Sequence, residues 1–246
     1  MNSNYLKIGK GVINEVGEAL EKNNIKGKIL YVSDSCVDCL YGTVIKLQLK
    51  SIGNLKEEYV NYNSIEYAMN IAERVIATDI DCIVGLGGGR VLDVCKYAAH
   101  ISKKPYLSIP TTAANDGLVS PIAVLKRKDD KPKSLGATMP SMILIDTEVI
   151  ANGPIQNIKA GIGDTISNYM ALLDWEFAVS HGKDEMNGYA YLMSKSSLDA
   201  LMKTHYTSIC YEFIEVLVNS LVLSGIAMEF VGSSRTVSGS DHLFSH

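Results

Sequence analysis

The segment CIVGLGGGRVLDVCKYAAHISKKPYLSIP, residues 82–110, contains the pattern that decides the fold. It opens with the apolar run CIVGLGGG, which is typical of a buried strand that ends in a turn. The stretch RVLDVCKYAAHIS then predicts a helix, and PYLSIP predicts a second buried strand. A strand, a crossover helix and a second strand are the unit from which parallel sheets are built.

The same alternation precedes this segment. Residues 9–24 have helical spacing, with Val12, Ile13, Val16 and Leu20 on one face, and the apolar run KILYVSD follows as a strand. Residues 57–62 then predict a strand and residues 64–79 a helix. We therefore expect an α/β domain whose parallel sheet is covered by helices on both faces.

The pattern changes in the second half of the chain. Residues 122–146 predict extended chain interrupted by a charged turn at 126–133, which we interpret as the solvated tip of a hairpin or loop. Beyond Gly153 three long apolar stretches predict helices. Because Asn152, Gly153 and Pro154 interrupt the pattern, we expect a dinucleotide-binding α/β domain at 1–152 and an all-α domain at 153–246.

Composition narrows the class of protein. A net charge of −4 gives no broad basic field, so we expect no nucleic-acid partner. The N-terminal residues lack the pattern of a signal peptide, and the most apolar run, at 216–228, is too short to span a bilayer. We therefore expect a cytoplasmic protein without a membrane span. Cys36 and Cys39 form a C-x-x-C that could suit redox chemistry or half a metal site, but we favour two packed thiols on a helix.

Three glycines, Gly87, Gly88 and Gly89, stand where the central strand meets its helix. The lack of side chains lets a ligand approach the backbone, and the helix N-terminus favours a pyrophosphate, so a dinucleotide is a natural ligand. The match to the dinucleotide-binding pattern is incomplete because Arg90 occupies the place of its last glycine. A purely structural turn would use the same residues.

Other polar residues at predicted strand ends extend this candidate site. Asp34 follows the strand KILYVS, where a carboxylate can accept from a ribose hydroxyl and favour NAD over NADP, although it could also be a helix cap. Asp93, one turn into the helix, could orient the glycine amides or be an ordinary acid near a helix N-terminus. The loop IPTTAANDGLVSP adds polar side chains that would contact ligand or form only a surface turn: Thr111, Thr112, Asn115, Asp116 and Ser120.

Four motifs in order carry a family resemblance: GLGGGRVLDVCK, IPTTAANDGLVSP, AGIGDTISNYMALLDW and GSSRTVSGSDHLFSH. Together they resemble the glycerol-1-phosphate dehydrogenases, within the iron-containing alcohol dehydrogenase and dehydroquinate synthase superfamily, over nearly the whole chain. The resemblance implies an α/β domain followed by a helical domain, with the active site in the cleft between them. It also implies a nicotinamide cofactor, NAD(H) or alternatively NADP(H), and a divalent metal, zinc or nickel or alternatively iron.

The resemblance assigns roles to particular residues. Asp164 and His242 match metal ligands of the family, and His246 matches a histidine that contacts substrate. The implied reaction interconverts dihydroxyacetone phosphate and sn-glycerol 1-phosphate. Asp116 and His246 would orient substrate hydroxyls beside Asp164, with His246 or a metal-bound water as the proton donor. Arg235 is the candidate for the substrate phosphate. We expect a small-molecule substrate and a homo-oligomer.

The sequence also departs from the family. The second histidine ligand of the family lies further along, in a stretch that this sequence does not contain, so we expect an apparently truncated helical domain with two of three ligands. RTVSG replaces the usual Arg-Pro-Ala-Ser-Gly, and Asp241 stands where Glu is common. Three alternatives stay open: a glycerol dehydrogenase acting on unphosphorylated polyol, a dehydroquinate synthase-like lyase, and an inactive nucleotide-binding fragment.

Overall fold

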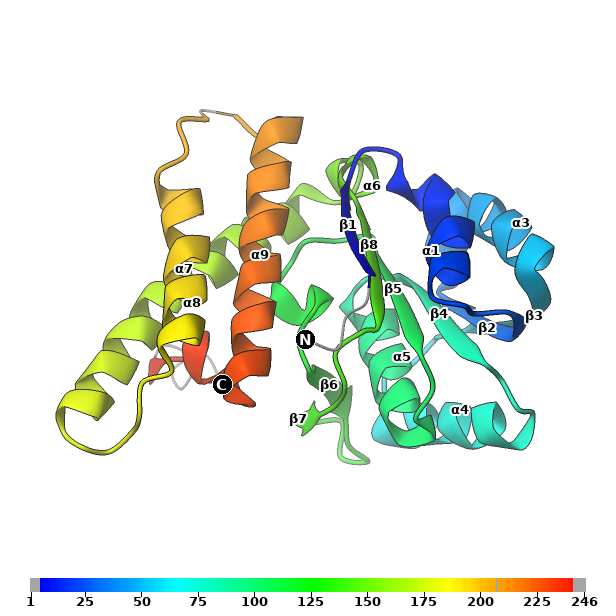
Figure 1. The fold of residues 1–246 in the computed structure, drawn as a ribbon, viewed down its shortest axis with the longest axis horizontal. Helices are drawn as coiled ribbons and strands as arrows, with labels where there is room; N and C mark the ends of the chain where they lie inside the picture. Colours follow the sequence, from blue (N-terminus) through cyan, green and yellow to red (C-terminus); the bar gives the residue numbers. More distant parts are fainter. Residues whose placement is uncertain (1–4, 207, 241–246) are drawn as a thin grey trace. The chain divides into compact units, whose positions relative to one another are not determined.

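The computed structural model describes residues 5–206 and 208–240, which fall into two compact units (Figure 1). The first unit comprises the chain up to Thr112 together with Ile122–Ile150. The second comprises Ala113–Pro121 together with the chain from Ala151 onward.

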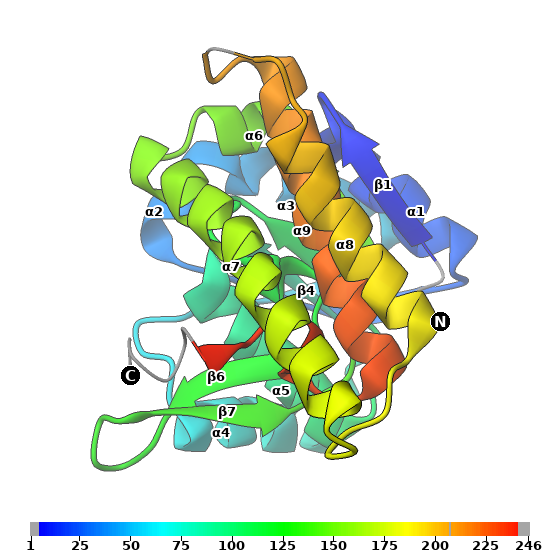
Figure 2. The same cartoon turned by 90° about the vertical axis from the view of Figure 1, so that its left-hand side faces the viewer.

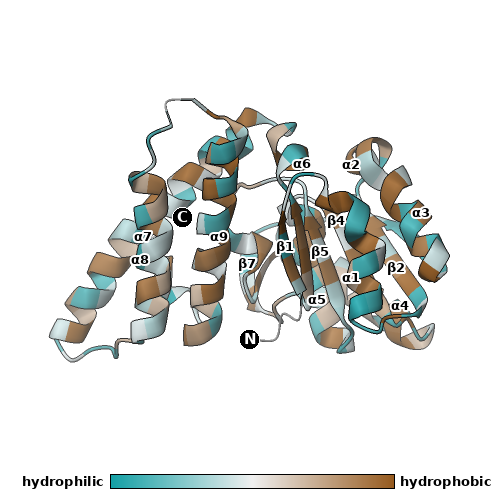
Figure 3. Cartoon of the chain, turned by 45° about the horizontal axis from the view of Figure 1, so that its top comes forward, coloured by the Kyte–Doolittle hydropathy of each residue, from teal (hydrophilic) through white to brown (hydrophobic). Residues whose placement is uncertain are grey.

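A parallel sheet forms the centre of the first unit. Its six strands lie in the order β1-β8-β5-β4-β2-β3. Their bounds are β1 Tyr5–Gly9, β2 Gly27–Ser33, β3 Gly53–Tyr59, β4 Cys82–Gly87, β5 Tyr106–Pro110 and β8 Met142–Asp146. The inner strands β4, β5 and β8 are buried along their whole length, as their apolar runs predict, and the sheet is mostly brown in Figure 3.

Helices cover both faces of this sheet, because each strand directs alternate side chains to opposite faces. One face packs on the turn η1 (Val12–Glu15) and the helices α1 (Val16–Lys22) and α3 (Thr43–Ile52). The other packs on α4 (Ile65–Ala77) and α5 (Gly89–Ser102). The α/β class expected for the N-terminal part of the chain is confirmed.

Three details of the first unit differ from expectation. Strand β1 was not recognised, since each of its residues is half-buried or exposed, and it pairs with β8 from the other end of the unit. The strand expected at 57–62 lies at Gly53–Tyr59. Cys36 and Cys39 do lie on helical turns, in α2 (Ser35–Val37) and a π-helical turn (Asp38–Gly42), but both are exposed, so the expectation of packed thiols is wrong.

The predicted charged turn is the tip of an antiparallel hairpin. Its strands are β6 (Ile122–Lys126) and β7 (Pro132–Gly136), with Lys126 opposite Pro132. The short helix α6 (Thr147–Ala151) then leads out of the sheet.

Helices build the second unit (Figure 2). They are α7 (Ile155–Ser180), α8 (Gly188–Met202) and α9 (Tyr211–Val231), with the short turns η3 (Asp116–Leu118) and η4 (Ser234–Thr236). The expected division at 152 placed residues 113–121 with the sheet, whereas the structure packs them inside the helical unit. The reason is close backbone contact with α7 and α9, described below.

Helix α9 is longer than the apolar run at 216–228 suggested. By length and composition alone its 21 residues could cross a membrane, but more than half of the relevant window, 61%, is buried inside the unit. Leu217, Val218 and Leu221 are fully enclosed and pack as core residues of a helical bundle. The helix is therefore accounted for by packing within this unit.

Candidate active site

The glycine turn joins β4 to α5 in the first unit. A Cβ at Gly87 would lie 2.8 Å from the side chain of Val91, and one at Gly88 would lie 3.4 Å from the Thr112 hydroxyl. At Gly89 no atom of the described residues, apart from the adjacent backbone of α5, lies within 4 Å of the position a Cβ would take. Gly87 is thus required by packing, whereas Gly89 leaves open space at the start of α5, where a phosphate could meet the helix N-terminus.

Residues from the neighbouring strands surround this turn. Asp34 follows β2, whose last residue, Ser33, is paired with Leu86 of β4. The backbone amide of Thr111, directly after β5, donates to the Gly87 carbonyl at 3.0 Å. The structure therefore brings Asp34, the glycines, Thr111 and Thr112 to the carboxyl ends of three adjacent parallel strands, the edge at which such sheets bind ligands.

Asp34 also caps a helix. Its Oδ1 accepts from the backbone amides of Cys36 and Val37, both at 3.0 Å. The capping role considered for this residue is therefore present. A ribose contact through its second carboxylate oxygen is compatible with the cap and stays a prediction.

Asp93 lies beside a buried lysine. Its Oδ1 is 3.6 Å from Nζ of Lys96, which is 1% exposed and donates to the Ile122 carbonyl at 2.7 Å. Burial raises the pKa of the Asp93 carboxyl, while Lys96 and the Val124 amide act in the opposite direction. These contacts tie α5 to strand β6, and among the described residues no contact of Asp93 with the glycine amides is seen.

In the second unit, residues 113–121 are wedged between two helices. A Cβ at Gly161 of α7 would overlap the carbonyl oxygen of Ala113, and a Cβ at Gly225 of α9 would overlap the Val119 side chain. Only glycine permits these approaches. At Gly163, on the same helix, a Cβ would meet no other part of the described chain within 4 Å.

This wedge places Asp116 in a polar ring of four residues, Asp116, Asp164, Asn168 and Ser224, which are joined by three hydrogen bonds and by the backbone of α7. The Asp116 backbone amide donates to Oδ2 of Asp164 on α7 at 3.0 Å, and its side-chain Oδ2 accepts from the Ser224 hydroxyl of α9 at 3.0 Å. Asn168, one turn after Asp164 on α7, lies 3.1 Å from the same hydroxyl and completes the ring. The Asp164 carboxylate expected at the active site is therefore in direct contact with the backbone amide of Asp116.

The Asp164 carboxylate is partly buried, and burial raises its pKa to about 6, with the Asp116 amide acting in the opposite direction. Among residues 5–206 and 208–240, no Lys, Arg or His lies within ion-pair distance of it. A desolvated carboxylate without a cationic partner is costly unless a cation neutralises it. Asp164 therefore fits the role of a metal ligand.

The described residues do not by themselves complete a metal site around Asp164. Within the described residues, no group of three or more His, Cys, Asp or Glu side chains is arranged to hold a metal ion. His242 and His246, predicted as metal and substrate contacts, lie outside the described residues. Ser120, predicted as a cofactor contact, is buried in the second unit, where its backbone nitrogen packs near Gly225.

Arg235 lies elsewhere in the second unit. Its Nε donates to the Asp184 carboxylate at 2.8 Å, and its Nη2 approaches the Asp174 carbonyl at 3.4 Å. Asp174 is about 15 Å along α7 from Asp164 at 1.5 Å per residue. The structure does not bring Arg235 to the polar ring, which favours a structural role, and its contact with a substrate phosphate stays a prediction.

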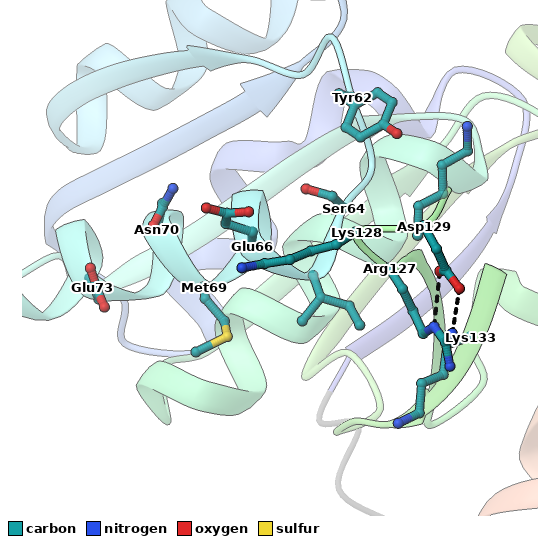
Figure 4. Close-up of a pocket in the computed structure, with 12 residues that line it drawn as sticks. Tyr62, Ser64, Glu66, Met69, Asn70, Glu73, Arg127, Lys128, Asp129 and Lys133 are labelled. Atoms are coloured by element: carbon teal, nitrogen blue, oxygen red, sulfur yellow. Dashed lines mark hydrogen bonds and ion pairs between the residues drawn. The ribbon is translucent and has the colours of Figure 1, made fainter. Parts of the chain in front are cut away.

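A cavity of about 890 Å³ opens in the first unit between α4 and the hairpin tip (Figure 4). Arg127 is paired with Asp129 at its rim, and the Lys128 side chain extends over it toward Glu66. None of the sequence-predicted site residues is among the residues that line it.

Sequence reasoning missed the two residues that complete the ring. Ser224 and Asn168 are 1% and 0% exposed, although each lies on a helix predicted from its apolar residues. A signal was present, because Asn168 stands four residues after Asp164 and therefore on the same helical face. Ser224 interrupts the most apolar run of the chain directly before Gly225.

Comparison with known proteins shows which family and which relatives the chain resembles. The model of the family described as "Iron-containing alcohol dehydrogenase" matches residues 7–154. A glycerol-1-phosphate dehydrogenase [NAD(P)+] of Methanosarcina mazei is 33% identical over 97% of this chain and 68% of its own length. One from Methanococcus maripaludis is 39% identical over 77% of this chain and 55% of its own.

Solved structures share the fold. Glycerol dehydrogenase from Schizosaccharomyces pombe superimposes with a TM-score of 0.76 at 20% identity, over 92% of this chain and 60% of that chain. Sulfoacetaldehyde reductase from Bifidobacterium kashiwanohense, solved in complex with NAD+, gives 0.71 at 16% identity, over 91% and 64%. The chain thus spans roughly two thirds or less of the length of these proteins.

Proposed function

The chain belongs to the iron-containing alcohol dehydrogenase family, and on that premise we propose that it is a metal-dependent, NAD(P)-dependent oxidoreductase that interconverts dihydroxyacetone phosphate and sn-glycerol 1-phosphate. The first unit would bind the dinucleotide and the second would hold metal and substrate. The observation that carries the proposal is the contact between Asp164, a desolvated carboxylate without a cationic partner among the described residues, and Asp116. Relatives with this activity match 97% of the chain, which supports the same reaction.

Each group of residues has a defined task in this proposal. The open backbone at Gly88 and Gly89 would receive the pyrophosphate, with Asp34 at the ribose and Thr111 and Thr112 beside the turn. Asp164, together with His242, would hold a divalent metal, zinc or nickel or alternatively iron.

When bound, the metal supplies Lewis acidity at the ketone oxygen, and the nicotinamide supplies hydride. Asp116 would accept hydrogen bonds from substrate hydroxyls and thereby fix the orientation of the carbon that changes oxidation state. His246 would contribute a second hydroxyl contact and move a proton. We further propose a cytoplasmic homo-oligomer.

One observation favours a second candidate, a glycerol dehydrogenase that acts on the unphosphorylated polyol. Arg235, the predicted phosphate contact, donates to the Asp184 carboxylate and is therefore engaged in an ion pair away from Asp164. A phosphate requires cationic or amide donors. The two candidates therefore differ in whether the substrate carries a phosphate group, for which a donor other than Arg235 would be needed.

The experiment that separates them is NADH oxidation at 340 nm with zinc or nickel supplied, comparing dihydroxyacetone phosphate with dihydroxyacetone. A strong preference for the phosphorylated ketone supports the first candidate, and turnover of the free ketone alone supports the second. Absence of turnover with both ketones would refute both. The matched variant Asp164→Ala should abolish metal-dependent turnover and leave NADH binding, followed by NADH fluorescence, unchanged.

A further inference from the structure

Ser224 and Asn168 form a directed chain of hydrogen bonds to Asp116. The Ser224 hydroxyl has a single proton and donates it to Oδ2 of Asp116 at 3.0 Å. The oxygen of Ser224 then has only acceptor capacity left for its contact with Asn168. Asn168 therefore presents its amide nitrogen, which fixes the orientation of a side-chain amide that otherwise could be reversed.

The chain lies in an enclosed environment. Asn168 is 0% exposed and Ser224 1%, so water does not compete for their hydrogen bonds. The second polar atom of the Asn168 amide, Oδ1, has no partner among the described residues. A buried amide with an unsatisfied oxygen is unusual between packed helices. An apolar side chain of similar size would pack there without leaving a polar atom unpaired.

Both ends of the chain are fixed by the same helix. Asn168 and Asp164 lie one turn apart on α7, and Asp164 accepts the backbone amide of Asp116. Asp116 is thereby held at two points, by its amide and by its carboxylate. Gly225, next to Ser224, admits the loop so closely that a Cβ would lie 3.0 Å from the Asp116 carbonyl oxygen. The position of the Asp116 side chain is thus set by α7 and α9 together.

We propose that Ser224 and Asn168 are positioning residues, which act through Asp116 to hold its carboxylate in the orientation that receives the substrate hydroxyls. This inference rests on the proposed function, since it assigns Asp116 to the substrate. Ser224 touches Asp116 directly, and Asn168 acts only by orienting the Ser224 hydroxyl. Neither residue touches the substrate.

The principal variant is Ser224→Ala, which removes the donor to Asp116 and leaves the Asp116–Asp164 contact in place. A hydrogen bond to a charged group has a strength that corresponds to about a 10-fold effect or more. We expect the KM for the ketone substrate to rise about 10-fold, the KM for NADH to stay within about twofold, and the affinity for zinc to stay within about twofold. A merely structural role would shift all three.

Ser220→Ala is the matched control. Ser220 lies one turn earlier on α9, is 0% exposed, and its hydroxyl has no hydrogen-bond partner among the described residues. The double variant Asn168→Leu/Ser224→Ala removes both polar groups, so no buried amide is left without a hydrogen-bond partner to destabilise the fold. It should reproduce the rise in KM expected for Ser224→Ala. In an Asp116→Ala background, Ser224→Ala should change nothing further.

Binding is measured independently of turnover by titrating dihydroxyacetone phosphate into the protein saturated with zinc and NAD+, a state without hydride to transfer to the ketone. A 10-fold weaker dissociation constant for Ser224→Ala, with Ser220→Ala unchanged, supports the inference. Equal behaviour of the two variants, or an effect that persists without Asp116, overturns it. If the unmodified protein turns over neither ketone, the proposed function is refuted, and the positioning role that rests on it is refuted too. That result is distinguishable from the failure of the positioning role alone, in which the unmodified protein is active.

Discussion

The substitution Asp164→Asn should stabilise the metal-free protein at neutral and alkaline pH. Burial raises the pKa of Asp164 from 3.8 to about 6, so the folded state binds a proton more readily than the unfolded state. Stability from this group is therefore present below pH 3.8, is lost as the pH rises toward about 6, and stays lost above it. Asparagine removes the charge and can still accept the Asp116 amide.

The size of the effect follows from the shift. About two pKa units correspond to about 3 kcal/mol, and because the carboxylate is only partly buried we expect about 1–3 kcal/mol of added stability for the variant at pH 8. For a chain of this size that raises the Tm by about 2–10 °C. At pH 4.5 most of the advantage should disappear, since the wild-type carboxyl is then largely protonated.

Thermal unfolding followed by circular dichroism, at pH 8 and pH 4.5 with a chelator present, measures this difference. Zinc in place of the chelator should raise the Tm of the wild-type protein and leave the variant unchanged, because a neutral amide is a poor ligand. A variant that is less stable than the wild type at pH 8 in the chelator would refute the reasoning. It would show that Asp164 has a favourable partner in the metal-free protein.

Three further predictions concern other residues. Gly161→Ala should destabilise the helical unit by about 1–3 kcal/mol, whereas the control Gly163→Ala should be neutral or stabilising by up to about 1 kcal/mol; urea unfolding distinguishes them. Arg235→Ala should lower the free energy of unfolding by about 1 kcal/mol or less and change the KM for dihydroxyacetone phosphate less than threefold, so a rise of about 10-fold would restore its substrate role. Asp34→Asn keeps an equally good helix cap but removes the charge, so we expect the kcat/KM ratio of NADPH to NADH to rise about 10-fold; an unchanged ratio would place Asp34 away from the ribose.

The sheet could be predicted because its central strands are buried on both faces. Leu86, Ile109 and Leu144 belong to uninterrupted apolar runs, and such runs have few alternatives to a parallel sheet between helices. Strand β1 escaped detection because Leu6 and other residues remain exposed, so its sequence carries no comparable run.

The site was only partly predictable, for a different reason. Asp34, Gly88 and Thr112 follow strands whose order in the sheet can be anticipated, so their proximity could be expected. The contact between Ser224 and Asp116 joins residues 108 positions apart and depends on how α9 packs. No local pattern encodes such a distance, and the same holds for the ion pair of Arg235 with Asp184.

The passage of residues 113–121 into the helical unit has a consequence for how the family can diversify. Ala113 and Val119 are completely buried there, although the chain on both sides of the loop belongs to the sheet unit. A single recombination near residue 150 would therefore join one parent's loop to another parent's helices. The loop would then collide with any larger side chain that stands in place of Gly161 or Gly225 in the other parent. We therefore expect viable chimaeras to exchange the loop and the helices together, which takes three crossover points instead of one.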